Sequence, residues 1–297
     1  KTCYYCVTNV FQGGIFMSFI DLHVHSTASD GTLSPTEVVE LAANSGLSAI
    51  ALTDHDTTVG ISEALNAAEK AGIQVIPGVE LSCIYKGKEI HILGLFVNWQ
   101  DPVFQTELDR LLSVRNQRNE EMLKRFQADG FPITYNDLTG GCPDTVITRA
   151  HFARVLTEKG FAPSINQAFQ KYLQYGGKYC LRKELITPEH AIEVLTANKA
   201  FPVLAHPCQY KLGWAETEAL IRHLTALGMQ GLEVYHSSQT PDQSRKLLAI
   251  GRKYGLLPTG GSDFHGANKP DISIGTGRGS LRLPETMLAD LRQARRL

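Results

Sequence analysis

Short apolar runs alternate with longer amphipathic stretches along most of the chain, and no other sequence feature restricts the fold as strongly. Short apolar runs bounded by turn signals predict buried strands, and amphipathic stretches predict helices. Repeated strand–helix units favour a parallel α/β sheet, and 297 residues suffice to close such a sheet into a barrel. We count seven barrel-type strands, at residues 19–24, 48–53, 73–76, a hairpin of 80–85 and 89–97, 200–205, 231–235 and 256–259.

The sequence pattern becomes mostly helical in the middle of the chain. A long charged helix is predicted at 103–129, and further helical pieces follow, one of them at 149–159. We therefore expect a barrel built from 17–100 and 200–297, interrupted by a helical insert domain at 101–199 that caps the active site.

Residues 1–16 lack this periodicity and precede Met17, so we interpret them as a leader or an expression remnant and leave them out of the fold prediction. Cys3 and Cys6 have CxxC spacing, but no second Cys or His pair stands nearby, and we predict no metal or redox role there. The remaining cysteines are scattered without a pattern, so we predict that they are free thiols in a reducing cytoplasm. They are Cys83, Cys142, Cys180 and Cys208.

Charge and hydropathy exclude two classes of partner. The formal net charge is −1, so no overall positive field would hold a long nucleic-acid duplex. No apolar run approaches the roughly 18 residues that a membrane span requires. A small anionic substrate or a short oligonucleotide held locally fits this charge better, and the sequence does not predict an oligomeric state.

The positions of the histidines carry the functional information. Seven of the ten lie at or just past the end of a predicted strand, where a parallel barrel builds its active site. Seven converging imidazoles would repel one another if protonated, and divalent cations with carboxylate partners are the usual way to hold them neutral. The histidines are His23, His25, His55, His91, His206, His236 and His265, and the accompanying acids are Asp30, Asp54, Glu80, Glu233 and Asp263.

Each of these residues also has an ordinary structural explanation when taken alone. His91 lies in an apolar strand, where a hydrogen-bonded core histidine is the common case, and Glu80 could be a surface strand residue. His55 could belong to a turn. Side chains of His23 and His25 share one face of a strand because alternate residues point the same way. The recurrence at every predicted strand end makes a metal site the better interpretation.

Five motifs in this order resemble the PHP (polymerase and histidinol phosphatase) family over nearly the whole chain from Phe19 to about Arg278. They are Asp21-Leu22-His23-Val24-His25-Ser26, Thr53-Asp54-His55, Gly78-Val79-Glu80, Ala205-His206-Pro207 and Ser262-Asp263-Phe264-His265. The resemblance implies a distorted seven-stranded (β/α)7 barrel that carries three divalent ions. Mn²⁺ is the expected metal, with Fe²⁺, Zn²⁺ or Mg²⁺ as alternatives that the ligand types also suit.

The resemblance further implies which residues hold each ion. The first would be bound by His23, His25, Glu80 and Asp263, and Glu80 would bridge to a second ion completed by His91 and His206. The third would be bound by Asp30, His55 and His265.

The helical insert, with Thr148-Arg149-Ala150-His151, resembles one branch of the family. That branch contains 3′,5′-nucleotide bisphosphate phosphatases and 5′→3′ exoribonucleases that act on short RNA. We accordingly expect a phosphoric ester hydrolase that uses a metal-bridging hydroxide, with Asp263, His236 and Glu80 as catalytic residues. Arg149, His236 and Lys178 are the candidates to bind substrate phosphate.

Other functions stay open at this point. An amidohydrolase-like enzyme cleaving C–N bonds shares the HxH strand, but it typically bridges its metals with a modified lysine, and no lysine ends a mid-barrel strand here. A non-catalytic metal-binding module is a second alternative, which the complete ligand set disfavours. A histidinol-phosphate-type phosphatase is the third, and the long insert disfavours it.

Overall fold

The computed structural model describes residues 18–142, 144–180 and 186–295, so the interpretation of residues 1–16 as a leader lies outside the described part. The strands are β1 (Phe19–Val24), β2 (Leu47–Leu52), β3 (Gln74–Tyr85), β4 (Lys88–Leu95), β5 (Phe201–Leu204), β6 (Gly231–His236), β7 (Leu257–Gly261) and β8 (Leu283–Pro284). The helices that flank them are α1 (Pro35–Asn44), α2 (Ile61–Ala71), α7 (Pro188–Ala197), α8 (Trp214–Ala226), α9 (Pro241–Lys253) and α10 (Thr286–Arg295).

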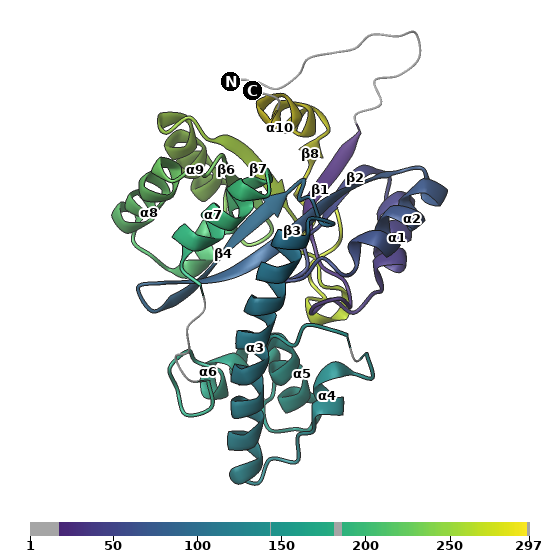
Figure 1. Cartoon of the computed structure of the whole chain (residues 1–297), viewed down its shortest axis with the longest axis vertical. Helices are drawn as coiled ribbons and strands as arrows, with labels where there is room; N and C mark the ends of the chain where they lie inside the picture. Colours follow the sequence, from purple (N-terminus) through teal and green to yellow (C-terminus); the bar gives the residue numbers. More distant parts are fainter. Residues whose placement is uncertain (1–17, 143, 181–185, 296–297) are drawn as a thin grey trace.

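The strands form one sheet in the order β7-β6-β5-β4-β3-β2-β1-β8, which curls until its two sides nearly meet (Figure 1). Just past β7, the Asp263 amide donates a hydrogen bond to the His23 carbonyl of β1 over 2.9 Å, and Phe264 bridges Val24. Gly261 permits this approach because a Cβ there would collide with His23. The result is a nearly closed α/β barrel.

Two details of the predicted barrel are wrong. The sheet has eight described strands rather than seven, because a two-residue strand, β8, pairs antiparallel with β1. A pairing this short leaves no sequence pattern. The predicted hairpin of β3 and β4 is confirmed, but β4 also runs antiparallel to β5, so the sheet is mixed rather than wholly parallel. The cause is a tight hairpin at Lys86 and Gly87, whose φ angles of 48° and 76° match a two-residue turn of the kind that joins antiparallel strands.

Two apolar layers support the barrel. Inward-facing side chains such as Ile20, Leu93 and Phe201 form its interior. Helix α10 contributes Leu288 and Leu291, which close the end of the barrel at which β1 begins. The outer layer lies between the sheet and its helices. Figure 1 shows α1 and α2 on one side and α7, α8 and α9 on the other. Both layers fix the strand ends that carry the histidines.

The segment between β4 and α7 is helical, as predicted. It contains α3 (Pro102–Ala128), α4 (Tyr135–Thr139), α5 (Arg149–Glu158) and α6 (Ile165–Tyr172). The first half of α3 packs into the outer barrel core through Leu108, whereas Phe126 in its second half belongs to a separate aromatic core. Helix α7 lies within 101–199 but packs against β3, β4 and β5. Helices α3 to α6 are called the insert below.

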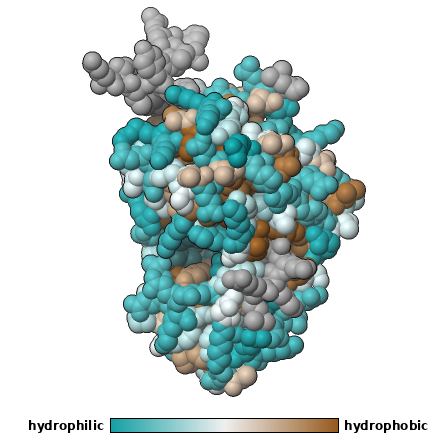
Figure 2. Space-filling model, turned by 90° about the vertical axis from the view of Figure 1, so that its left-hand side faces the viewer, coloured by the Kyte–Doolittle hydropathy of each residue, from teal (hydrophilic) through white to brown (hydrophobic). Residues whose placement is uncertain are grey.

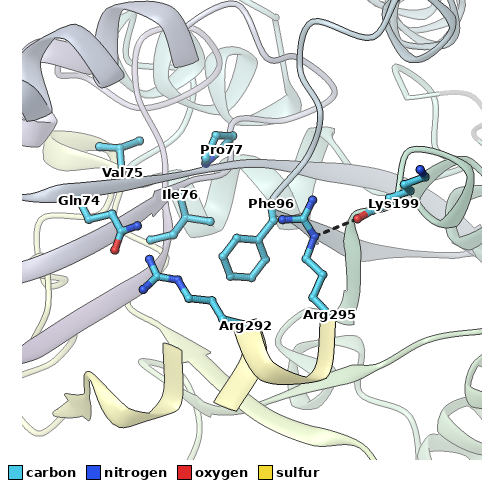
Figure 3. A pocket seen from close by; sticks show the side chains of 8 residues that line it. All are labelled: Gln74, Val75, Ile76, Pro77, Phe96, Lys199, Arg292 and Arg295. Atoms are coloured by element: carbon cyan, nitrogen blue, oxygen red, sulfur yellow. Dashed lines mark hydrogen bonds between the residues drawn. The ribbon is translucent and has the colours of Figure 1, made fainter. Parts of the chain in front are cut away.

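A cavity of about 460 Å³ lies at the end of the barrel opposite the histidines (Figure 3). Its lining includes Gln74 at the start of β3, Phe96 just after β4, and Arg292 and Arg295 of α10. It contains none of the predicted ligands. Among the described helices, none has the length and apolar character needed to cross a membrane.

Candidate metal centre

The structure gathers all nine predicted ligands at the end of the barrel that faces the insert. Eight are buried and His91 is partly exposed. Within the described residues, the ligand atoms form overlapping groups in which all atoms lie within 4.8 Å of one another. These groups are His25, Asp30, His55 and His265; His23, His25 and Asp263; His23, Glu80 and His206; His55, Glu80 and His91; and His23, Glu233 and His236.

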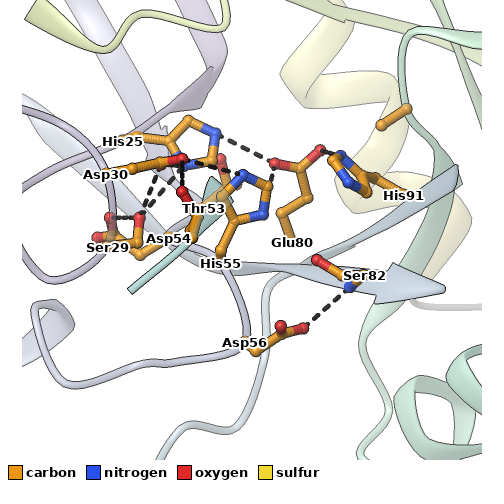
Figure 4. Close-up of polar contacts among 12 residues, drawn as sticks. His25, Ser29, Asp30, Thr53, Asp54, His55, Asp56, Glu80, Ser82 and His91 are labelled. Atoms are coloured by element: carbon orange, nitrogen blue, oxygen red, sulfur yellow. Dashed lines mark hydrogen bonds and ion pairs between the residues drawn. The ribbon is translucent and has the colours of Figure 1, made fainter. Parts of the chain in front are cut away.

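Glu80 lies at the centre of the cluster and contacts five imidazoles. Its Oε1 lies 2.8 Å from His91 Nδ1 and 2.9 Å from His206 Nε2. The other oxygen, Oε2, lies 3.3 Å from His23 Nε2, 3.2 Å from His25 Nε2 and 3.3 Å from His55 Nδ1. Figure 4 shows the carboxylate between His25 and His55 on one side and His91 on the other. A carboxylate that uses both oxygens in this way can bridge two cations.

The donor set fits divalent cations. Imidazole nitrogens face each other closely, as in the 3.1 Å between His23 Nε2 and His25 Nε2. Such pairs need a common partner, because neighbouring imidazoles cannot all donate protons to one another. His206 Nδ1 and His236 Nε2 are buried and make no hydrogen bond among the described residues. Buried polar atoms are normally satisfied, so unpaired nitrogens beside carboxylates indicate a ligand that accepts lone pairs.

Burial and neighbouring charges together set the protonation states of these groups. It lowers the pKa of His25 well below its usual value, and neighbouring His265 strengthens the effect. Burial also lowers the pKa of His206 to about 4. For Asp30, burial would raise the pKa, but His55 and His265 outweigh it and hold the pKa well below the usual range. Neutral imidazoles and ionised carboxylates are the protonation states in which these groups bind metal.

His91 and His23 have a raised pKa, unlike His25, His55 and His206, because carboxylates outweigh burial at both; Glu80 and Glu233 do so at His23. His91 shows the effect with several partners. Burial lowers its pKa, but the charge of Glu80 and hydrogen bonds to Glu80 and Glu89 outweigh burial and raise the pKa to about 10. A cation that binds between Glu80 and His91 therefore has to displace a proton.

Residues around the ligands hold them in place. Asp54 accepts hydrogen bonds from the hydroxyls of Ser26 and Ser29, at 2.7 and 2.6 Å, and so secures the loop that carries Asp30 (Figure 4). Glu233 lies 3.0 Å from His23 Nδ1 and accepts from the His206 amide at 2.6 Å. Both acids are among those that follow predicted strands, but only the structure reveals their partners.

Two of the three predicted substrate-binding residues lie at the cluster. His236 Nε2 is 3.4 Å from Asp263 Oδ2, and Arg149 contacts Glu89, which lies 3.4 Å from His91 Nε2. Lys178 is not brought to the cluster. Its side chain is 66% exposed, and its ammonium pairs with Asp129 at the end of α3 farthest from the barrel (Figure 1).

Sequence reasoning missed three polar side chains that contact ligands or their neighbours. The Thr148 hydroxyl donates to Asp30 over 2.7 Å, and Lys269 donates to Asp263 over 2.6 Å. Arg115 of α3 donates through Nε to Asp56, the residue after His55, over 2.8 Å. Thr148 was identifiable as an N-cap, but its carboxylate partner lies 118 residues away. Figure 2 shows the surface hollowed where insert and barrel meet.

A barrel whose mouth carries buried imidazoles around a bridging carboxylate defines a metal-dependent hydrolase. The family model described as PHP domain matches residues 21–234, and the chain belongs to this family. It is similar to a 5′-3′ exoribonuclease from Haemophilus influenzae, with 38% identity over 82% of this chain and 89% of that protein. It is also similar to a 3′,5′-nucleoside bisphosphate phosphatase from Chromobacterium violaceum, with 34% identity over 87% of this chain and 91% of that protein.

A solved structure supports the same assignment. The chain superposes on a protein from Bifidobacterium adolescentis, provisionally named a metal-dependent phosphoesterase, with a TM-score of 0.82 and 28% identity. The match covers 94% of this chain and 96% of that one. The likeness therefore includes the insert as well as the barrel.

Proposed function

We propose that this chain hydrolyses nucleotide phosphate esters. Its substrates are the 3′-phosphate of 3′,5′-bisphosphonucleotides, the 5′ end of short RNA, or both. The observation that carries the proposal is Glu80, whose two oxygens contact five imidazoles at the barrel mouth. The similarity to an exoribonuclease and to a bisphosphate phosphatase narrows the substrate to nucleotides.

The residues support a centre of three divalent cations, with Mn²⁺ as the metal. Asp30, His55 and His265 would hold one ion, and Glu80 would be shared between the other two. His23, His25 and Asp263 would complete the first of these, and His91 and His206 the second. Oxygen and imidazole donors without thiolate suit Mn²⁺. Bound there, the cations would activate a water for attack on phosphorus and neutralise charge on the phosphoryl oxygens.

The protein's own residues orient the substrate. His236 lies beside Asp263, and it donates a hydrogen bond to the scissile phosphate or a proton to the leaving oxygen. Arg149 starts α5, and its planar guanidinium can form two parallel hydrogen bonds to a second phosphate. The insert, within residues 101–199, contacts the mouth through Thr148 and Arg115 and caps the site. A mouth bordered in this way suits a mononucleotide or a chain end rather than a long duplex.

The four described cysteines outside residues 1–16 are free thiols. Free thiols are typical of reducing compartments, so we place the protein in the cytoplasm.

The test is phosphate release by Mn²⁺-loaded protein. Adenosine 3′,5′-bisphosphate and a 5′-phosphorylated short RNA are compared in parallel, with Asp263→Ala as the inactive control. Asp271→Asn is the matched control, because Asp271 is an exposed acid that pairs with Arg278. Metal-dependent phosphate release or RNA shortening, lost in Asp263→Ala and kept in Asp271→Asn, supports the proposal. Metal binding without turnover of either substrate contradicts it.

A further inference from the structure

Glu89 on β4 connects the predicted metal ligand His91 to the insert. The two residues are two positions apart on one strand, so their side chains share a face. Glu89 Oε1 lies 3.4 Å from His91 Nε2, and Oε2 lies 2.9 Å from Arg149 Nη2. The Glu89 side chain is only 12% exposed. One nearly buried carboxylate therefore contacts both a ligand and a candidate substrate-binding residue.

The two nitrogens of His91 face different partners. Nδ1 faces the cluster, at 2.8 Å from Glu80 and 3.3 Å from His206, whereas Nε2 faces Glu89. Histidines that bind metal through one nitrogen usually donate the other N–H to a carboxylate, which fixes the tautomer and the ring orientation. The contact of 3.4 Å is long for a hydrogen bond, so its attraction is mainly electrostatic.

A second arginine near Glu89, Arg118, forms no ion pair with an acid in the part of the chain that the structure describes. Arg118 of α3 is 2% exposed and donates to Asn119 Oδ1 over 3.1 Å, while its Nη1 has no hydrogen-bond partner among the described residues. Burial lowers the pKa of Arg118 to about 10, with Arg115 adding to the effect and Glu89 opposing it. If Arg149 turns from Glu89 to a substrate phosphate, the charge of Arg118 still balances Glu89.

A carboxylate at this position attracts both the imidazole N–H of His91 and the guanidinium of Arg149.

We propose that Glu89 is a positioning residue shared by the metal centre and the insert, orienting His91 through Oε1 and Arg149 through Oε2. Binding of the cation at His91 and recognition of the substrate's second phosphate are thereby coupled through one side chain. The part of the proposal that concerns Arg149 rests on the proposed function, because it takes Arg149 as the phosphate-binding residue. The part that concerns His91 requires only that His91 is a metal ligand.

The first experiment measures Mn²⁺ binding without any nucleotide. Glu89→Gln keeps the shape of the side chain but removes its charge, and Glu89→Asp keeps the charge on a shorter stem. Glu216→Gln is the matched control, because Glu216 is a half-exposed acid that contacts the β3–β4 hairpin at Lys86. Calorimetry and metal content should show one class of Mn²⁺ sites weakened by about 10- to 100-fold in Glu89→Gln. Glu89→Asp should recover part of the affinity, and Glu216→Gln should match the wild type.

Unchanged Mn²⁺ affinity in Glu89→Gln, with folding verified by its melting temperature, overturns the proposal. If Glu89→Gln does not fold, the Mn²⁺ affinity of Glu89→Asp is measured instead. Wild-type Mn²⁺ affinity in Glu89→Asp would then contradict a positioning role for Glu89.

The second experiment tests the shared carboxylate with a double-mutant cycle. KM for adenosine 3′,5′-bisphosphate is measured at saturating Mn²⁺ for Glu89→Gln, Arg149→Met and the double variant. A common carboxylate predicts that the double variant raises KM by less than the product of the two single effects. If the double variant raises KM by the full product of the two single effects, Glu89 does not couple the metal centre to Arg149. If the wild type does not hydrolyse this nucleotide, the proposed function fails, and the Mn²⁺ measurement still decides the role of Glu89 at His91.

Discussion

The barrel mouth and the insert both contribute polar side chains to the site, but they place them by different means. In the barrel, regular strands carry His23, His25 and Glu80 to one edge, and neighbouring strand ends meet there by geometry alone. In the insert, Arg115 and Thr148 reach the barrel from a helix and an N-cap whose positions depend on tertiary packing. The barrel thus supplies the candidate metal ligands, and the insert adds contacts to those ligands and their neighbours.

This difference also appears in the apolar cores. Barrel side chains pack between sheet and helices, whereas the insert has its own core of stacked aromatic rings, including Phe126 and Tyr179 with ring centroids 4.1 Å apart. Helix α3 belongs to both cores. Changes at the junction should therefore affect the two regions together, and changes within the insert should leave the barrel ligands in place.

The largest effect is expected at the junction. Arg115 is 2% exposed and pairs with Asp56 and with the Ser82 hydroxyl. Arg115→Ala leaves Asp56 buried without its counter-charge, so the free energy of unfolding should fall by about 3–5 kcal/mol in urea titrations. Arg110→Ala removes a half-exposed arginine of the same helix and should cost less than about 1 kcal/mol. Equal losses in the two variants would contradict a barrel–insert link at Arg115.

The next effect is sensitivity of the insert to acid. Burial lowers the pKa of His151 to about 4, against about 6.5 in an unfolded chain. Below pH 6.5 the unfolded state binds the proton more readily, so stability falls as pH drops toward 4, by about 3 kcal/mol. His151→Gln keeps an acceptor for the Thr148 amide and should remove this part of the loss.

Unfolding free energies at pH 7 and pH 4 measure the effect. His223→Gln is the control because His223 is half exposed on α8. If His151→Gln loses as much stability as the wild type between these pH values, His151 does not account for the acid sensitivity.

A smaller effect is expected where the insert contacts Asp30. Thr148→Val removes the hydroxyl that donates to Asp30, and Mn²⁺ affinity should fall by about 10- to 100-fold in calorimetric titrations. The lost N-cap should also cost about 1 kcal/mol of stability. Thr157→Val on the same helix removes a hydroxyl whose hydrogen-bond partner among the described residues is the Ala153 carbonyl, and it should leave Mn²⁺ affinity unchanged. Wild-type Mn²⁺ affinity in Thr148→Val would show that the barrel alone orients Asp30.

The smallest effect is expected at Lys178, which the sequence nominates for phosphate binding and the structure pairs with Asp129. Lys178→Ala should change stability by no more than about 0.5 kcal/mol and KM by less than about twofold. Arg149→Ala, compared in the same assay, should raise KM clearly. A tenfold rise in KM for Lys178→Ala would instead show that the insert brings this lysine to the substrate.

The sequence by itself determined the helical insert, the barrel class and the histidines and acids at the strand ends. These features follow from local rules: alternate residues share a strand face, and the ends of parallel strands meet at one edge. His23 with His25 and Asp263 with His265 are each read from spacing alone. The choice of nine ligands among these residues comes from the resemblance to the family.

Only the tertiary structure decided the strand count, the antiparallel pairing of β4 with β5 and the partners of the insert side chains. A two-residue strand such as β8 has no periodicity to detect. Arg115 and Asp56 lie 59 residues apart, and Lys178 and Arg149 both looked suitable for phosphate. Such pairings depend on how α3 and α5 pack, and packing is a sum of many small contacts that no local pattern encodes. For this reason the metal-binding chemistry of the barrel mouth can be read from the sequence, whereas the contacts that insert side chains make with the barrel cannot.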